Sequence, residues 1–291
     1  MKYYILLICT LLVSSCATIP RNYEECNKEK VLHPLLEKTK TGVGIQMHTH
    51  QTAPIYADLI KEISPEYIRQ DWFSSEGTNH HDYFVNLAES INSTLIFIVK
   101  GENIFTTEFD PEILKSEVAK YKGKKIIWEL ENEPDGFWTP EEYYTWATSV
   151  SSIIKKADPN ACVIGPAIKG ISDKRFHYLE TLVEMGFSNY VDGISFHCYY
   201  NNPESSVEDF DRLKKLLCDT GKPFLVSEGG PSNNDVDPWL YLSKFTNIVE
   251  KNDGIVFIWY AVEGGANFPL LEDWERTKFS YDFENFIESR K

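Results

Sequence analysis

The chain has 291 residues, of which 42% are hydrophobic and 25% charged. This composition excludes a disordered or collagen-like chain and is sufficient for a sizeable core. With 44 acidic against 29 basic residues the formal net charge is −15, so we expect no nucleic-acid partner, because no basic surface is available for a phosphate backbone. The 17 Phe, 16 Tyr and 7 Trp suit a large core and would also supply flat surfaces for sugar rings.

The N-terminal segment has the pattern of a signal peptide. Lys2 precedes an apolar run from Tyr3 to Val13 that is too short to span a membrane. The following Ser-Ser-Cys at 14–16 resembles the lipobox of bacterial lipoproteins, in which the cysteine is lipidated and becomes the new N-terminus. An ordinary secretory signal with an incidental cysteine is the alternative.

This resemblance predicts a signal peptide over residues 1–15, lipidation of Cys16 and a polar N-terminal segment over 16–40. The protein would then lie in a bacterial cell envelope, extracytoplasmic, and contact the membrane only through its lipid.

Four cysteines remain beyond the signal peptide and Cys16: Cys26, Cys162, Cys198 and Cys218. Their spacing matches neither a zinc motif nor a dense disulfide framework. Cys162 and Cys198 fall on neighbouring predicted strands, which would allow one bridge, but buried free thiols are the favoured interpretation.

Short β-rich apolar runs alternate with segments of helical periodicity along the rest of the chain. The predicted strands cover residues 43–48, 67–71, 94–99, 125–130, 162–165, 193–197, 223–227 and 255–259. Helix starts between them are marked by Asp110-Pro111 and by a capping box from Thr139 to Glu142.

Eight strands alternating with helices predict a single (β/α)8 TIM barrel over residues 41–291, in the α/β class. An open doubly wound sheet is the alternative, but no glycine-rich phosphate loop follows the first predicted strand. We expect the chain to act as a monomer.

In such a barrel the chemistry lies at the C-terminal ends of the strands. Glu133 follows the fourth predicted strand and Glu228 the seventh, so both would lie at one mouth of the barrel. Two facing carboxyl groups can divide the work at a glycosidic bond, one as proton donor and the other as nucleophile. We expect their mutual repulsion to raise the pKa of the group that acts as the acid.

Two segments resemble clan A retaining glycoside hydrolases. The sequence WELENEPD at 128–135 is similar to the Trp-Glu-x-Trp-Asn-Glu-Pro segment of family 39 and more loosely to family 5. The sequence KPFLVSEG at 222–229 resembles the seventh strand of the clan. The resemblance implies a (β/α)8 barrel, a carbohydrate substrate, no metal or organic cofactor, Glu133 as acid/base and Glu228 as nucleophile.

The same resemblance implies roles for five further residues. Asn132 holds the sugar 2-hydroxyl, Arg69 keeps the nucleophile ionised, His197 and Tyr199 form the motif whose aromatic hydroxyl contacts the nucleophile, and Trp259 floors the sugar subsite.

Other polar residues at the strand ends leave alternatives open. Glu131 departs from the family tryptophan and either adds a charge to the pocket or points away from it. Trp72 is expected to build a wall of the site, and His48 to contact substrate. His48 and His50 could instead open a metal site, but the sequence lacks the further ligands that such a barrel hydrolase needs.

The sequence therefore predicts a lipid-anchored retaining glycoside hydrolase that cleaves a poly- or oligosaccharide, with β-linkages expected. The alternatives are a non-catalytic carbohydrate-binding barrel and, less favoured, a metal-dependent hydrolase built on His48 and His50.

Overall fold

The computed structural model describes residues 32–48, 50–101, 109–263 and 267–291. The predicted signal peptide, Cys16, Cys26, the first part of the N-terminal segment and the glycine-rich stretch at 264–266 lie outside the described residues.

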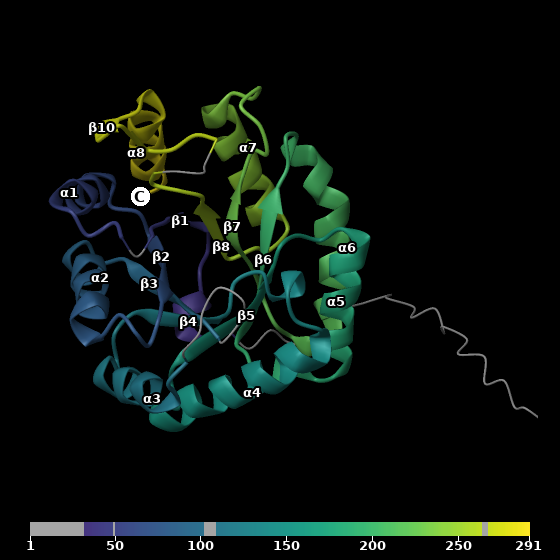
Figure 1. Cartoon of the computed structure of the whole chain (residues 1–291). Coiled ribbons are helices and arrows are strands. Elements are labelled where there is room, and N and C mark those ends of the chain that lie inside the picture. The colour runs from purple at the N-terminus through teal and green to yellow at the C-terminus, as the bar shows by residue number, and fades with distance from the viewer. Residues whose placement is uncertain (1–31, 49, 102–108, 264–266) are drawn as a thin grey trace, which may run out of the picture.

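Eight parallel strands form a closed barrel in sequence order, with β1 paired to both β2 and β8. They are β1 (Gly42–Gln46), β2 (Tyr67–Trp72), β3 (Thr94–Val99), β4 (Ile126–Leu130), β5 (Cys162–Ile168), β6 (Gly193–Tyr199), β7 (Phe224–Gly230) and β8 (Val256–Trp259). All eight predicted strands are present, and the (β/α)8 barrel is confirmed. Figure 1 shows the helices arranged around the outside of these strands.

The eight helices of the described residues alternate with the strands. They are α1 (Pro54–Ile63), α2 (Thr78–Ser90), α3 (Pro111–Lys120), α4 (Pro140–Ala157), α5 (Asp173–Glu184), α6 (Val207–Leu217), α7 (Pro238–Lys251) and α8 (Lys278–Arg290). Short 3-10 turns cover Pro34–Leu36, Pro134–Gly136, Phe187–Asn189, Pro203–Ser206 and Cys218–Thr220, and a small hairpin pairs β9 (Leu271–Glu272) with β10 (Glu275–Arg276).

The predicted helix starts are confirmed by their hydrogen bonds. Asp110 accepts hydrogen bonds from the backbone N–H groups of Glu112 and Ile113, and the capping box of Thr139 and Glu142 is complete. These caps satisfy orphan donors in the first turn, which is why the two helices begin there.

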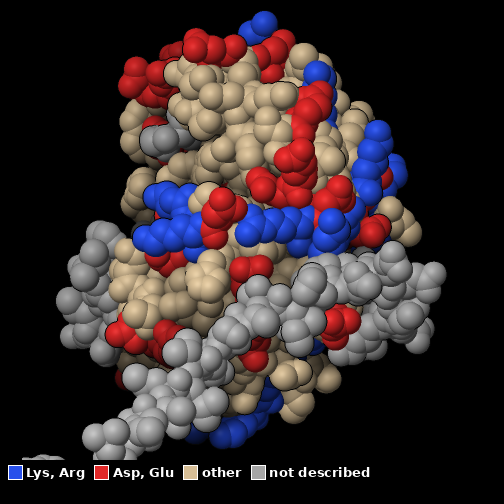
Figure 2. Space-filling view, turned by 90° about the vertical axis from the view of Figure 1, so that its right-hand side faces the viewer, with Lys and Arg blue, Asp and Glu red and all other residues tan. Residues whose placement is uncertain are grey.

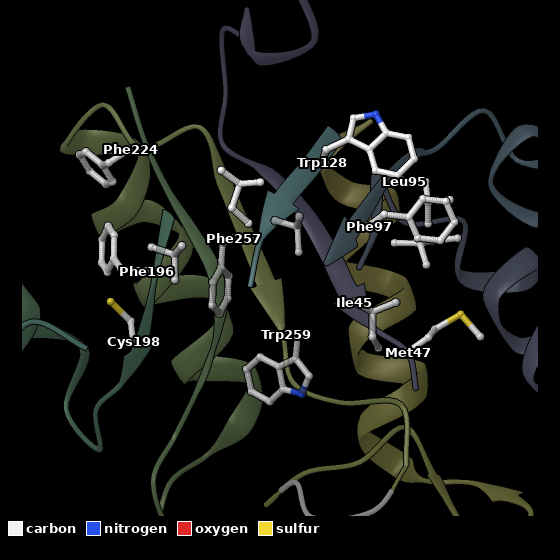
Figure 3. Close-up of a cluster of buried hydrophobic side chains, with 14 of the residues drawn as sticks. Ile45, Met47, Leu95, Phe97, Trp128, Phe196, Cys198, Phe224, Phe257 and Trp259 are labelled. Atoms are coloured by element: carbon white, nitrogen blue, oxygen red, sulfur yellow. The ribbon is translucent and has the colours of Figure 1, made fainter. Parts of the chain in front are cut away.

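Side chains alternate between two cores because successive strand residues face opposite sides of a sheet. Tyr67, Ile96 and Leu225 belong to a small cluster of buried side chains, to which inward-facing positions of several strands contribute. A much larger cluster packs outward-facing residues such as Phe97 and Phe257 against the helices, and Figure 3 shows part of it. Gly44 lies against Tyr67 and leaves no room for a side chain, because a Cβ there would lie 2.5 Å from the Cβ of Tyr67.

The cysteine prediction is confirmed in part. Cys162 and Cys198 are buried free thiols, so they do not bridge each other. Cys218 is disulfide-bonded, so the interpretation of that residue as a free thiol is wrong.

The surface carries both signs of charge. On the face shown in Figure 2, acidic and basic side chains lie beside one another and form no continuous basic surface. Among the described residues, no helix combines the length and the apolar character that a membrane span requires.

Candidate active site

A cavity of about 390 Å³ lies at the C-terminal mouth of the barrel. Its walls come from segments far apart in the sequence and bring seven of the predicted site residues together. The lining residues are Gln46, His48, Arg69, Asp71, Ile98, Asn132, Glu133, Lys169, Tyr199, Glu228, Pro231, Trp259, Tyr260, Asn267 and Phe268.

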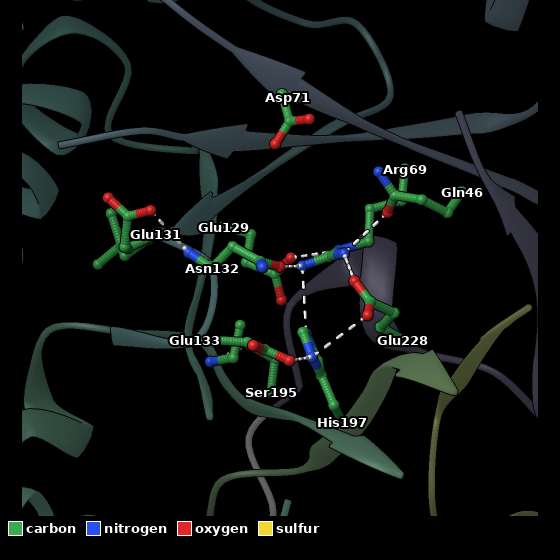
Figure 4. A network of polar contacts seen from close by, with 12 residues as sticks. Gln46, Arg69, Asp71, Glu129, Glu131, Asn132, Glu133, Ser195, His197 and Glu228 are labelled. Carbon is green, nitrogen blue, oxygen red and sulfur yellow. Dashed lines mark hydrogen bonds and ion pairs between the residues drawn. The ribbon is translucent and has the colours of Figure 1, made fainter. Parts of the chain in front are cut away.

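Arg69 is the centre of the polar network in this cavity (Figure 4). Its side chain is fully buried on β2 and forms ion pairs with Glu129 at 2.6 Å and Glu228 at 2.8 Å. It also donates to Gln46 Oε1 at 2.8 Å and to Asn132 Oδ1 at 2.7 Å. A buried guanidinium needs such partners, since an unpaired charge would be very costly there.

Glu228 is held on both of its oxygens. Oε2 accepts from Arg69 Nη1, and Oε1 accepts from the hydroxyl of Tyr199 at 2.5 Å. Burial raises the pKa of Glu228, but His197, Arg69 and the Tyr199 hydrogen bond outweigh burial and lower it below its usual value. Burial, followed by the charge and the hydrogen bond of Glu228, raises the pKa of Tyr199. Glu228 is therefore ionised and Tyr199 is a neutral hydrogen-bond donor.

Glu133 lies at the tip of β4 in a left-handed backbone conformation, with φ of 52°. Its Oε1 is 3.1 Å from His197 Nδ1 and its Oε2 is 3.2 Å from Lys169 Nζ. Burial raises the pKa of Glu133, but the hydrogen bond and charge of His197 and the charge of Lys169 overcome it and hold the pKa at about 2. The expectation of a raised pKa is therefore wrong for this protein without substrate, because the contacts with His197 and Lys169 outweigh burial.

His197 connects the two carboxylates. Its Nδ1 is 3.1 Å from Glu133 Oε1 and 3.6 Å from Glu228 Oε1. Ligand atoms of Glu133, His197 and Glu228 all lie within 4.8 Å of one another, so an oxygen of each glutamate is within that distance of the other. The same three groups could in principle ligate a metal, but the buried Arg69 cation at 2.8 Å from Glu228 disfavours a second cation.

His48 and Trp259 lie on the cavity wall as expected, with different surroundings. Burial lowers the pKa of His48, whose ring meets the Tyr260 ring edge-on at a centroid distance of 5.6 Å. His48 and His50 stack at 5.8 Å, and neither belongs to a group of three metal donors among the described residues. Trp259 is fully buried and also packs on Phe279 of α8, 4.8 Å between centroids.

The prediction that Trp72 forms a wall of the site is wrong. Trp72 is fully buried in the outer core, where its Nε1 donates to Glu117 at 2.7 Å and its ring stacks on His81. Since Arg69 and Asp71 face the cavity, the alternation of the strand turns Trp72 to the opposite side of β2.

Glu131 is not among the residues that line the cavity. It is fully buried with φ of 65°, and its oxygens contact the backbone N–H of Gly101 at 2.6 Å and Lys100 Nζ at 3.1 Å. Of the two alternatives for Glu131, the structure favours the one in which it points away from the pocket.

Sequence reasoning missed Lys169 and Phe268 at the cavity, and it gave Tyr260 no role. Lys169 directly follows β5, but the predicted strand ends at residue 165, so the sequence analysis did not place Lys169 at a strand end. Tyr260 directly follows β8, so its position at a strand end was a usable signal.

No protein-family model and no curated protein match the chain. Solved structures do match, and they share the (β/α)8 barrel fold of this chain. A family 39 glycoside hydrolase from the gut symbiont Bacteroides cellulosilyticus superposes with a TM-score of 0.72 at 19% identity, over 86% of this chain and 64% of that one. This chain thus spans less than two thirds of that structure.

Two further structures are similar at lower TM-scores. An endo-β-1,4-mannanase from Thermotoga petrophila has a TM-score of 0.60 at 15% identity, over 87% of this chain and 77% of that one. A xylanase from Thermotoga maritima has a TM-score of 0.61 at 14% identity, over 89% of this chain and 98% of that one. At these identities the comparisons establish the fold, and the chemistry has to be argued from the site.

Proposed function

We propose that this protein is a retaining glycoside hydrolase that cleaves a β-linked poly- or oligosaccharide, with Glu228 as nucleophile and Glu133 as acid/base. One observation carries the proposal: a carboxylate oxygen of Glu133 and one of Glu228 lie within 4.8 Å of each other in a cavity at the barrel mouth. Retaining enzymes hold their two carboxyl groups about 5–5.5 Å apart, whereas inverting enzymes leave about 6.5–9.5 Å for a water.

The reaction proceeds in two displacements. Glu228 attacks the anomeric carbon while the bond to the leaving oxygen breaks, and that oxygen takes the proton of Glu133. Water then attacks the anomeric carbon of the glycosyl-enzyme, Glu133 accepts a proton from this water, and Glu228 is released as a carboxylate. The two carboxyl groups and one water supply every atom and proton that the two steps need, so the proposal includes no cofactor.

The surroundings of Glu228 suit a nucleophile. Arg69 and Tyr199 hold its two oxygens in one orientation at 2.8 and 2.5 Å, and the lowered pKa keeps it ionised. Orientation and charge state are thereby set before substrate arrives, which reduces the reorganisation needed in the transition state. Asn132, fixed by Arg69 at 2.7 Å, is placed to hold a sugar hydroxyl beside it.

The proposed location is an oxidising extracytoplasmic compartment. The disulfide bond of Cys218 supports this location, because disulfides persist mainly outside the reducing cytosol. The lipid on Cys16 and the monomeric state remain part of the proposal on the strength of the sequence.

The test is turnover of a panel of β-linked glycans and aryl β-glycosides, with the anomeric configuration of the first-formed product read by proton NMR. We expect a product of retained configuration, and a loss of about 10⁴-fold or more in Glu228→Gln, at unchanged folding. Glu208→Gln, an exposed glutamate on α6, is the matched control and should keep full activity.

Two results would contradict the proposal. An inverted product would reject double displacement, and wild-type turnover by Glu228→Gln would reject the assignment of the nucleophile. Saturable binding of a glycan without any product would favour the non-catalytic carbohydrate-binding barrel instead.

A further inference from the structure

Lys169 is held by its backbone, whereas its side chain is largely exposed. It follows β5, and its N–H donates to Asp135 Oδ1 at 3.0 Å. Arg175 pairs with Asp135 at 3.4 Å and donates to the carbonyl oxygen of Lys169. The Lys169 side chain itself is 53% exposed, and its ammonium contacts Glu133 Oε2 at 3.2 Å. An ion pair this exposed contributes little stability, so its partner can be replaced at small cost.

This contact conflicts with the acid role of Glu133. His197 faces Oε1 at 3.1 Å, which leaves Oε2 as the oxygen that would carry the acidic proton. An ammonium has three donors and no acceptor, and its charge at 3.2 Å from Oε2 favours the ionised carboxylate over the protonated acid. Movement of Lys169 away from Oε2 therefore favours the protonated form of Glu133 that donates a proton.

The departing sugar lies within reach of the displaced ammonium. The leaving oxygen has to lie within hydrogen-bond distance of Glu133, and Lys169 Nζ is 3.2 Å from the same carboxyl group. A neutral hydroxyl would be a poor replacement for a carboxylate as partner of a strongly hydrated ammonium. A second anion would replace the carboxylate with little loss.

Resting on the function proposed above, we propose that Lys169 recognises an anionic group, a uronate carboxylate or a sulfate ester, on the sugar that leaves from Glu133. Binding of this substrate draws the ammonium from Glu133 Oε2 and so favours protonation of the acid. The low pKa of Glu133 without substrate, to which Lys169 contributes, agrees with this exchange.

The first test compares leaving groups on one sugar that the panel shows to be accepted. Three aryl β-glycosides carry a carboxylate, its neutral methyl ester or a sulfate on the phenol ring. We expect kcat/KM at pH 7 to favour the anions over the ester by about tenfold in the wild type. Lys169→Met should abolish this preference, and Lys169→Arg should retain most of it. The comparison of the carboxylate substrate with the sulfate substrate shows which of the two anionic groups Lys169 prefers.

A pH profile gives a second readout that a merely structural lysine would not change. Lys169→Met removes a cation that favours ionised Glu133, so the pKa of Glu133 rises and the basic limb with the ester substrate moves to higher pH. Lys244→Met is the control, because Lys244 is an exposed lysine that pairs with Glu204, and it should change neither the preference nor the limb.

A binding measurement tests anion recognition by Lys169 independently of the proposed hydrolase activity. Calorimetric titration with a uronate trisaccharide and a neutral trisaccharide needs no turnover. A preference for the uronate that disappears in Lys169→Met supports anion recognition even in a protein that cleaves nothing. Equal affinity for both, in active or inactive protein, overturns it, and so does a kcat/KM preference that survives in Lys169→Met.

Discussion

The two glutamates of the cavity lie in contrasting surroundings. The side chain of Glu228 is only 10% exposed and is held by Arg69 and Tyr199, whereas that of Glu133 is 23% exposed. The partners of Glu133 are His197 and the half-exposed Lys169. Arg69 and Tyr199 maintain a single charge state in Glu228, while the exposed Lys169 is a partner that Glu133 can exchange as its protonation changes. The proposed reaction requires this difference, since the nucleophile begins ionised and the acid/base alternates.

The largest expected effect is the loss of activity on removal of the acid/base, and its size should depend on the leaving group of the substrate. Glu133→Ala should lower kcat/KM by about 10²–10⁴-fold for glycosides with a poor leaving group, because their oxygen needs a proton. Nitrophenyl glycosides need little protonation and should lose much less in the first step. Initial rates and bursts with both substrate types check this, and equal losses for the two types would contradict the acid role.

Arg69→Met tests the buried contacts that hold Glu228. Breaking a buried ion pair leaves unpaired carboxylates, so we expect a loss of about 3–5 kcal/mol in the free energy of unfolding at pH 7. Glu228 has a lowered pKa in the folded protein, so its stabilisation is present above the unfolded pKa of about 4.3 and is lost as pH falls. The destabilisation should therefore shrink toward acid pH, where the unpaired carboxylates become protonated.

Urea unfolding at several pH values provides that measurement. The matched control is Arg212→Met, which removes a surface pair with Asp173 at 2.7 Å and should cost no more than about 1 kcal/mol. Equal costs for the two variants would show that Arg69 is not the centre of the site's stability.

Tyr199→Phe should weaken the contacts of Glu228 less than Arg69→Met does. It removes one hydrogen bond to Glu228, for which we expect about a tenfold loss in kcat/KM. Since that hydrogen bond lowers the pKa of Glu228, the acidic limb of the pH profile should move to higher pH. An unchanged acidic limb would mean that Tyr199 does not influence the charge of the nucleophile.

Trp72→Phe should change stability alone. The indole is packed in the outer core and donates to Glu117, so we expect a loss of about 1–3 kcal/mol from the lost hydrogen bond and the lost volume. KM and kcat should stay at wild-type values, since Trp72 lies outside the cavity. A raised KM would restore the prediction that this tryptophan contacts substrate.

The sequence was sufficient for the barrel because its signals are local. Apolar runs marked all eight strands, and Asp110 and Thr139 marked helix starts. The alternation of side chains between the two faces of β2 was also a usable signal. If Arg69 faces the pocket, this alternation places Trp72 on the opposite face of the strand, outside the pocket.

Other features of the site could not be read from the sequence. The direction of Glu131 depends on a left-handed backbone that interrupts the strand alternation. The low pKa of Glu133 depends first on His197 and then on Lys169, which come to it from β6 and from the end of β5. Both result from tertiary structure, which has no local sequence signal.

The backbone at the tip of β4 also bears on engineering of this protein. Glu131 and Glu133 both have positive φ, at 65° and 52°, a region that β-branched and bulky side chains enter only with strain. Random substitution at these two positions should therefore yield mostly unfolded or misaligned protein. A library intended to alter substrate choice would retain more folded variants if it varied the more exposed rim at Lys169, Tyr260 and Asn267.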